Sequence, residues 1–370
     1  MRYAGEVVFL RIFDLGGTVD LAKAREALGA LADAGAVASA RGAPEYVSFA
    51  LPLPLNLASL NLAPGEYAGR PVAASARLYE VGGLALMLRV PVRADNLKDF
   101  ARASEFRPAL DGRDAAIREW FERLAERLRP TLKDAIDEVF QVPIEPERYT
   151  VYCLTEAPLE AAELLVRERA QVAGLLLSEP DAHRLAPGTL DDTLRQRFSY
   201  YAGDLAVADW DAAFLLEPSG QYEDLLYVFE AANLQLLVLR KYDKYLDDVL
   251  ERSYVEFERL ARRPRLFARK AWRMSRELAE VRMDLAKATD ELANLSKFFG
   301  EWYLARVYLG AAGKLHCADF QQSVASKVAT LNELYANLLQ EIDVRRSLLL
   351  EIAIVLLIVL EILMALFGKL

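Results

Sequence analysis

The sequence predicts an α+β protein made of three parts. These are an N-terminal mixed α/β head over residues 1–217, a coiled-coil stalk over 221–345 and a C-terminal transmembrane helix over 346–370. Three observations predict this order. Short apolar runs bounded by turn residues alternate with amphipathic segments in the first part. A 4-3 apolar repeat marks the second part, and an almost unbroken apolar run marks the third.

The head is predicted from a pattern of strands and helices that partly occurs twice, which suggests two related βαββ halves. The first set comprises a strand over 7–13, a helix over 18–34, an extended segment over 46–55, a hairpin of 72–79 with 84–92, and a polar helix over 112–140. The second set comprises a strand over 149–154, a helix over 158–178 and two short strands within 204–217.

The stalk is predicted from apolar residues that repeat at steps of four and three, as in a coiled coil. Three helices are expected, over 222–260, 265–299 and 319–345, with Pro264 breaking the chain after the first. The first apolar stripe contains Leu225, Val228, Ala232, Leu239, Tyr242, Leu246 and Val249. The last contains Val324, Val328, Leu331, Tyr335, Leu338 and Ile342, and it continues without a breaker into the apolar end.

The C-terminal run LLLEIAIVLLIVLEILMALF (348–367) has the length of a membrane-spanning helix, about 30 Å at the helical rise. Only Glu351 and Glu361 in it are not apolar. Arg345 and Arg346 precede it, which places the bulk of the chain on the cytoplasmic side. The sequence therefore predicts a tail-anchored, single-pass protein of the cell inner membrane, with a buried core helix as the alternative.

The segment LNELYANLLQEIDVRRSLLLEIAIVLLIVLEILMAL (331–366) resembles the C-terminal signature of the family named "required for meiotic nuclear division". The matching features are Arg345, Arg346, the pair Leu350-Glu351 and Glu361; Ile352 departs from a frequent Trp. The segments 233–247 and 297–308 are also similar to the helical part of that family. The resemblance implies a membrane-anchored α/β head. Mitochondrial relatives are associated with organelle translation, as tethers rather than enzymes, and no catalytic residue is implied.

A basic run is the clearest local charge anomaly, because no acidic residue falls between Glu258 and Glu277 in a chain of net charge −9. In an antiparallel hairpin of the last two stalk helices it would lie at the membrane surface, against anionic head groups. Contact with RNA phosphates and a solvated helix face are the alternatives. The predicted contact residues are Arg262, Arg263, Arg265, Arg269, Lys270, Arg273, Arg345 and Arg346.

Glu361 would lie near the bilayer centre, where an ionised carboxylate is costly. We interpret it as an intramembrane helix–helix contact that fixes a homo-oligomer. A tolerated neutral acid on a monomeric anchor is the alternative.

Four other motifs have ordinary structural interpretations. Asp14-Leu15-Gly16-Gly17-Thr18 is expected to be a turn with Thr18 as N-cap, and a phosphate-binding turn is the alternative. Asp209 and Asp211 are expected to flank a hairpin turn, and a metal or acid–base pair is the alternative. His316-Cys317 is expected to pack between helices, without acting as a nucleophile. Phe198, Tyr200, Tyr201 and Trp210 are expected in the core, and a ligand cage is the alternative.

The sequence predicts no enzyme, no cofactor and no metal site. Two cysteines and two histidines provide neither a disulfide framework nor the ligands of a structural zinc site. The acidic net charge argues against a DNA-binding surface. We expect a homo-oligomeric membrane scaffold or tether that presents its head to a protein or ribonucleoprotein partner. A membrane-localised enzyme or nucleotide-binding head, with Asp14, Thr18, Asp209 and Asp211 lining a pocket, is the alternative.

Overall fold

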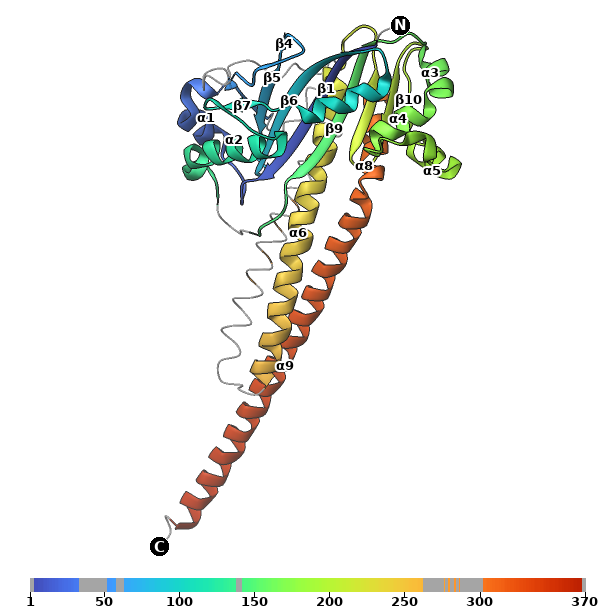
Figure 1. The fold of residues 1–370 in the computed structure, drawn as a ribbon. Coiled ribbons are helices and arrows are strands. Elements are labelled where there is room, and N and C mark those ends of the chain that lie inside the picture. Colours follow the sequence, from blue (N-terminus) through green and yellow to red (C-terminus); the bar gives the residue numbers. More distant parts are fainter. Residues whose placement is uncertain are drawn as a thin grey trace. The chain divides into compact units, whose positions relative to one another are not determined.

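The protein has a mixed α/β fold with a large N-terminal sheet and C-terminal helices (Figure 1). The computed structural model describes residues 3–32, 52–57, 63–137, 142–261 and 302–367, together with positions 276, 279, 283 and 286. The coarse fold class is therefore confirmed. Two compact units are present. One contains Met1–Lys241 and Ala288–Gln321, and the other contains Tyr242–Lys287 and Gln322–Leu370.

The sheet has eight strands in the order β10-β11-β12-β9-β1-β6-β5-β2. The long strands β1 and β9 pair antiparallel at its centre, and β12 runs parallel to β9. The strands are β1 (Tyr3–Asp14), β2 (Leu53–Leu55), β5 (Ala73–Leu78), β6 (Gly83–Ala94), β9 (Glu147–Glu156), β10 (Arg197–Phe198), β11 (Leu205–Ala208) and β12 (Ala212–Leu216). Two separate hairpins are formed by β3 (Glu66–Tyr67) with β4 (Arg70–Pro71), and by β7 (Ala109–Leu110) with β8 (Arg113–Asp114).

One face of the sheet is buried by a single apolar cluster. Val7 and Phe9 of β1 belong to it, together with Phe121 of helix α2 (Ile117–Leu132). Successive side chains of a strand point to opposite faces, so the odd-numbered residues of β1 supply this layer. The covering elements are α1 (Leu21–Leu28), the 3-10 helix η3 (Leu97–Glu105), α2 (Ile117–Leu132), α3 (Ala161–Arg167) and α4 (Arg169–Leu176), with α5 (Pro187–Thr193) beside α4.

The other face is covered by the first part of helix α6 (Glu223–Ala261), which Figure 1 shows crossing the strands. Phe229 of α6 stacks on Tyr149 of β9, with ring centroids 5.6 Å apart. A Cβ atom at Gly83 would lie 2.3 Å from Leu234 Cδ1, so a larger residue there would force the Leu234 side chain of this helix to move. The even-numbered residues of β1, such as Leu10 and Ile12, are buried on this side.

The predicted hairpins β5–β6 and β11–β12 are confirmed. The helix expected over 112–140 begins only at Ile117, because the preceding residues form the β7–β8 hairpin with Asp111 and Gly112 at positive φ. The helix expected over 158–178 is divided at Glu168, whose φ of −107° and ψ of 16° are not helical. Part of the extended segment expected over 46–55 lies outside the described residues.

Helices α6 and α9 (Cys317–Phe367) contact each other within the second unit. Lys327 of α9 lies 2.7 Å from the carboxylates of both Asp243 and Asp247. Further along, the hydroxyls of Ser253 and Tyr335 are 2.8 Å apart. The remaining described helix, α8 (Trp302–Lys314), belongs to the first unit. The expected middle helix over 265–299 lies outside the described residues apart from the isolated positions.

The prediction of a transmembrane anchor is wrong. Within the described ranges, no helix combines the length and the apolar character that a bilayer crossing requires. The run that suggested an anchor is the last part of the 51-residue helix α9, and it carries two exposed carboxylates, Glu351 and Glu361. Charged groups of this kind are costly in hydrocarbon. The predictions of a tail anchor, of inner-membrane localisation and of an intramembrane contact at Glu361 are corrected accordingly.

Candidate functional site

Helix α6 is joined to the sheet by four ion pairs with four different strands. In its first half the partners are acidic on the helix and basic on the sheet. Glu223 lies 2.6 Å from Arg89 of β6, and Glu230 forms an ion pair with Arg77 of β5. Glu230 is fully buried and also accepts a hydrogen bond of 2.7 Å from the Tyr79 hydroxyl. The carboxylate of Glu230 raises the pKa of the Arg77 guanidinium, which keeps Arg77 charged.

In the next turns of α6 the signs are reversed. Arg240 forms an ion pair with Glu147 of β9, and Lys241 Nζ lies 2.8 Å from Asp14 Oδ1 of β1. Lys241 also donates to the carbonyl of Gly16. Burial raises the pKa of Asp14, and the attraction of Lys241 opposes that change without cancelling it. Burial likewise raises the pKa of Glu147 against the effect of Arg240. Desolvation therefore outweighs the charge attraction at both carboxylates.

The Gly16-Gly17 segment is an ordinary turn, and the backbone amides on either side of it are already hydrogen-bonded. Leu15 N donates to Gly82 O at 2.9 Å, and Val19 N donates to Glu80 O at 2.8 Å. A Cβ atom at Gly17 would lie 1.2 Å from the carbonyl oxygen of Asp137, so close backbone approach explains this glycine. A phosphate-binding turn would need free amides pointing outward. This arrangement therefore supports the turn interpretation.

The predicted N-cap at Thr18 is wrong. Helix α1 starts at Leu21, and the carboxylate of Asp20 accepts hydrogen bonds from Ala22 N and Lys23 N. Those backbone hydrogen bonds, chiefly the one from Lys23, lower the pKa of Asp20. The helix begins later than predicted because residues 15–19 are held by backbone hydrogen bonds to other segments.

Asp209 and Asp211 lie in the turn between β11 and β12, as the hairpin interpretation expected. Their environments differ, because Asp209 is buried and Asp211 is exposed. Asp209 Oδ1 lies 2.8 Å from Lys314 Nζ of α8, and its carbonyl accepts a hydrogen bond of 3.0 Å from the Tyr149 hydroxyl. Within the part of the chain that the structure describes, no group of three or more His, Cys, Asp or Glu side chains is placed to bind a metal.

The His316-Cys317 pair lies at the junction of α8 and α9. His316 Nδ1 is 2.7 Å from Asp319 Oδ2, and its ring lies 5.2 Å from that of Trp210. Cys317 is buried, and burial raises the pKa of its thiol to about 12. Because the thiolate is the nucleophile, a thiol that stays protonated at neutral pH is a poor one. The packing interpretation is supported for Cys317, whereas His316 is exposed.

The aromatic cluster was expected in the core, and this prediction is wrong for three of its four members. Phe198 is buried, but Tyr200, Tyr201 and Trp210 are 58%, 71% and 48% exposed. Residues 200–203 form a turn after β10. The side chain of Asp204 closes this turn by accepting hydrogen bonds from Tyr200 N and Tyr201 N. The aromatic composition gave no indication of this turn.

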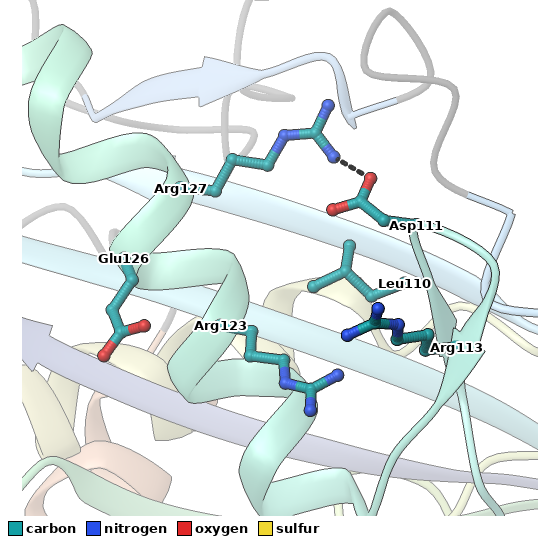
Figure 2. A pocket seen from close by; sticks show the side chains of 6 residues that line it. All are labelled: Leu110, Asp111, Arg113, Arg123, Glu126 and Arg127. Atoms are coloured by element: carbon teal, nitrogen blue, oxygen red, sulfur yellow. Dashed lines mark hydrogen bonds and ion pairs between the residues drawn. The ribbon is translucent and has the colours of Figure 1, made fainter.

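Two hollows of about 600 Å³ each lie in the first unit. Figure 2 shows the first, the arginine hollow, between α2 and the β7–β8 hairpin. Arg127 lies 2.6 Å from Asp111 across it, and Arg123 forms an ion pair with Glu119 one turn back on α2. These carboxylates neutralise two of its three guanidinium groups. The hollow is lined by Leu110, Asp111, Arg113, Arg123, Glu126 and Arg127.

The second hollow, the sheet cavity, lies over the centre of the sheet. Its floor contains Phe9 of β1 with Thr150 and Tyr152 of β9, and its walls come from η3, α4 and residues 178–183. None of the sequence-predicted site residues lines either hollow. The basic run Arg262–Arg273 lies outside the described residues. Arg345 and Arg346 lie on α9, where their side chains are outside the described part. The lipid and RNA interpretations therefore stay untested.

The buried charges of α6 were missed at the sequence level. The sequence did contain an indication of buried charge. Glu230 directly follows the apolar run YVF, and Arg240 and Lys241 directly follow the apolar run LLVL. A charged residue inside such a run is rarely buried unless it is paired. The partner strands, however, are more than 90 residues away along the chain.

Residues 4–223 match the family described as "Uncharacterized protein MJ0711, N-terminal domain". The chain belongs to this family. The match begins in β1 and ends at the first residue of α6. A relative named "Uncharacterized protein MJ0711", from Methanocaldococcus jannaschii, is 25% identical over 221 residues. The alignment covers 60% of this chain and 66% of the relative, which is just under two thirds of the relative's length. No solved structure matches the chain.

The resemblance to the family "required for meiotic nuclear division" is corrected by this result. The matched range is the N-terminal part, whereas that resemblance rested on residues 200–370. Long helices with 4-3 apolar repeats and apolar ends share residue patterns because of helix geometry, whatever their ancestry. The residue pattern of the C-terminal helix was therefore a weaker indicator of family than the sequence of the N-terminal part.

Proposed function

We propose that this protein is a homo-oligomeric scaffold that presents its α/β head to a protein or ribonucleoprotein partner. In this proposal, copies of the chain associate through the C-terminal part of α9. The observation that carries the proposal is the exposed apolar surface between Ile352 and Met364. Leu356 and Leu357 are each 63% exposed, and Met364 is 69% exposed.

This surface extends around the whole helix. Val355, Leu356, Leu357 and Ile358 follow one another along α9, and consecutive helical residues point in directions about 100° apart. A helix that is apolar on all sides is stable only when other apolar groups surround it, and large exposed apolar patches mark interaction sites. A second copy offers the same apolar surface at the same height on its own α9, which favours self-association.

The head supports a structural role more than a catalytic one. Asp14 and Asp209 each form an ion pair with a lysine from a C-terminal helix. Burial raises the pKa values of Cys153 and Cys317, which keeps both thiols protonated. Two features of the proposed architecture go with this role. The contacts of α6 with α9 support a coiled-coil stalk. The strand orders β1-β6-β5-β2 and β9-β12-β11-β10 match and support two related halves, but β6 is antiparallel to β1 whereas β12 is parallel to β9.

The alternative, an enzyme or nucleotide-binding head, expected a pocket lined by Asp14, Thr18, Asp209 and Asp211. These residues line neither of the two hollows described above. Their positions therefore lend that alternative no support.

The test is site-directed cross-linking of the full chain in cells. The native thiols of Cys153 and Cys317 are buried, so a new exposed cysteine will react selectively. Leu357→Cys should form covalent dimers or larger species on oxidation, because this residue lies in the proposed interface. Glu333→Cys, at an exposed polar position on the same helix, is the matched control and should react much less. Equal yields at the two positions, or no cross-link at position 357, would contradict self-association through this segment.

A further inference from the structure

The sheet cavity has the properties of a small-molecule site. Its volume of about 600 Å³ falls within the range of ligand pockets, which are mostly apolar with a few placed polar groups. Phe9 and Leu175 are buried apolar residues in its lining, and Ala101 and Ala170 add small side chains. A flat ring or a short apolar chain fits a surface of this composition.

A tyrosine at the floor of the cavity carries a hydroxyl that has no partner among the described residues. Tyr152 is only 6% exposed and lines the cavity, yet its hydroxyl makes no hydrogen bond with any described residue. Burial alone raises the pKa of this phenol to about 12, so it is a neutral hydrogen-bond donor at physiological pH. The hydroxyl oxygen itself is accessible and has no hydrogen bond within the described part of the chain, which makes it a candidate ligand contact. Thr150, two residues earlier on the same face of β9, adds a second hydroxyl at the floor.

A pair of arginines lies beyond the lining residues, on the same face of the sheet. Phe9 lies opposite Thr150 in the sheet, and the next pair on the same face is Arg11 opposite Arg148. Burial, followed by repulsion from Arg148, lowers the pKa of Arg11 to about 10. Arg11 packs over the ring of Phe121 and donates to the carbonyl of Leu10, but it forms no ion pair with a described carboxylate. The positive charges of Arg11 and Arg148 favour an anion near this end of the cavity, although Asp211 and Glu122 offset part of the charge at Arg11.

One charged side chain at the rim of the cavity has no ion-pair or hydrogen-bond partner among the residues that the structure describes, whereas the others do. Lys98 has no side-chain partner within the described part of the chain, although its backbone N donates to Gln171 Oε1 at 3.3 Å. The other charged rim residues are engaged. Arg167 lies 2.7 Å from Glu163, Glu179 accepts from Asp181 N at 2.9 Å, and Asp181 lies 3.7 Å from Arg184. The ammonium of Lys98 is therefore available to a ligand.

We propose that the sheet cavity binds a small amphipathic carboxylate, with its apolar ring or chain over Phe9 and Leu175. The Tyr152 hydroxyl donates a hydrogen bond to the ligand, and Lys98 and Arg148 attract its carboxylate. The site lies wholly in the head and does not depend on the proposed self-association through α9.

The test compares a charged and a neutral probe that share one ring system, naphthalene-2-carboxylate and naphthalene-2-methanol. Binding to the full chain is measured by saturation-transfer NMR and isothermal titration. The carboxylate should bind more tightly than the alcohol. Lys98→Gln with Arg148→Gln should weaken carboxylate binding by about tenfold or more and leave alcohol binding nearly unchanged. Lys133→Gln, an exposed lysine of the same unit that does not line the cavity, is the matched control and should change neither.

Two further variants test the location of the site. Tyr152→Phe removes one oxygen and should weaken both probes by about threefold to tenfold, since the net effect of one hydrogen bond is of that size. Ala101→Trp should fill the cavity and abolish binding of both probes, and circular dichroism will check that this variant is folded. The proposal is overturned if neither probe binds at millimolar concentration, if both bind equally well, or if folded Ala101→Trp still binds the carboxylate.

Discussion

On one face of the central sheet, helices α1 to α4 bury an apolar cluster around Val7, Phe9 and Phe121. On the other face, α6 brings charged side chains against four strands. Apolar contact is non-directional, so the first face can tolerate small shifts of its helices. An ion pair at a buried position must meet its partner, so the second face selects one register. The comparison shows that the two faces of one sheet have different roles. Apolar burial on one face drives folding, and the ion pairs on the other face fix the position of α6.

The largest expected effect comes from breaking one of these ion pairs. Lys241→Met leaves the Asp14 carboxylate buried without its cation and should lower the free energy of unfolding by about 3–5 kcal/mol. The double variant Asp14→Leu with Lys241→Met removes both charges and should recover most of that loss. Chemical denaturation of the single and double variants measures both values. A double variant as unstable as the single one would show that the pair does more than fix position.

A core truncation on the opposite face should behave differently. Leu124→Ala on α2 removes a fully buried side chain and should cost about 2–5 kcal/mol, because a cavity remains. Combining it with the Asp14→Leu and Lys241→Met pair should add to the cost, since Leu124 lies in the apolar cluster on one face and the Asp14–Lys241 pair lies on the other. The same denaturation experiment measures this. Strong non-additivity would mean that the sheet transmits the change from one face to the other.

The smallest expected effect is a pH dependence of the charged face. Burial places the folded-state pKa of Asp14 above its unfolded value near 3.9, so the folded state binds more protons in the window between them. Stability supplied by protonated Asp14 is therefore lost as pH rises through that window. Without Lys241 the folded-state pKa of Asp14 rises further, and the window widens upward.

The cost of Lys241→Met should consequently be smaller at pH 4 than at pH 7. Urea denaturation at pH 4, 5, 6 and 7 measures this difference, with Lys133→Met as an exposed-lysine control whose cost should not vary. A cost that is the same at every pH would show that Asp14 does not titrate in this range.

The long strands and the two hairpins were predictable because their signals are local. Alternating apolar residues and the Val81-Gly82-Gly83 turn indicate β5 and β6 without reference to the rest of the chain. The N-cap at Asp20 and the exposure of Tyr200, Tyr201 and Trp210 were not predictable in this way. The N-cap depends on the backbone hydrogen bonds that hold residues 15–19 to distant segments, and the exposure of the two tyrosines depends on the turn closed by Asp204, which the residue types do not specify. The sheet cavity also brings together β1, η3, β9 and α4, which are far apart in sequence.

By itself, the sequence determined the α/β class of the head and the helical period of the C-terminal part, because hydrophobic periodicity reports the local geometry of the chain. Only the tertiary structure decided that α6 lies against the sheet, which of its charges are buried, and where the cavity forms. Those features arise from pairings between residues remote in sequence. An apolar helix end likewise has no assigned neighbour until its surroundings are known, so its pattern alone led to the incorrect membrane prediction.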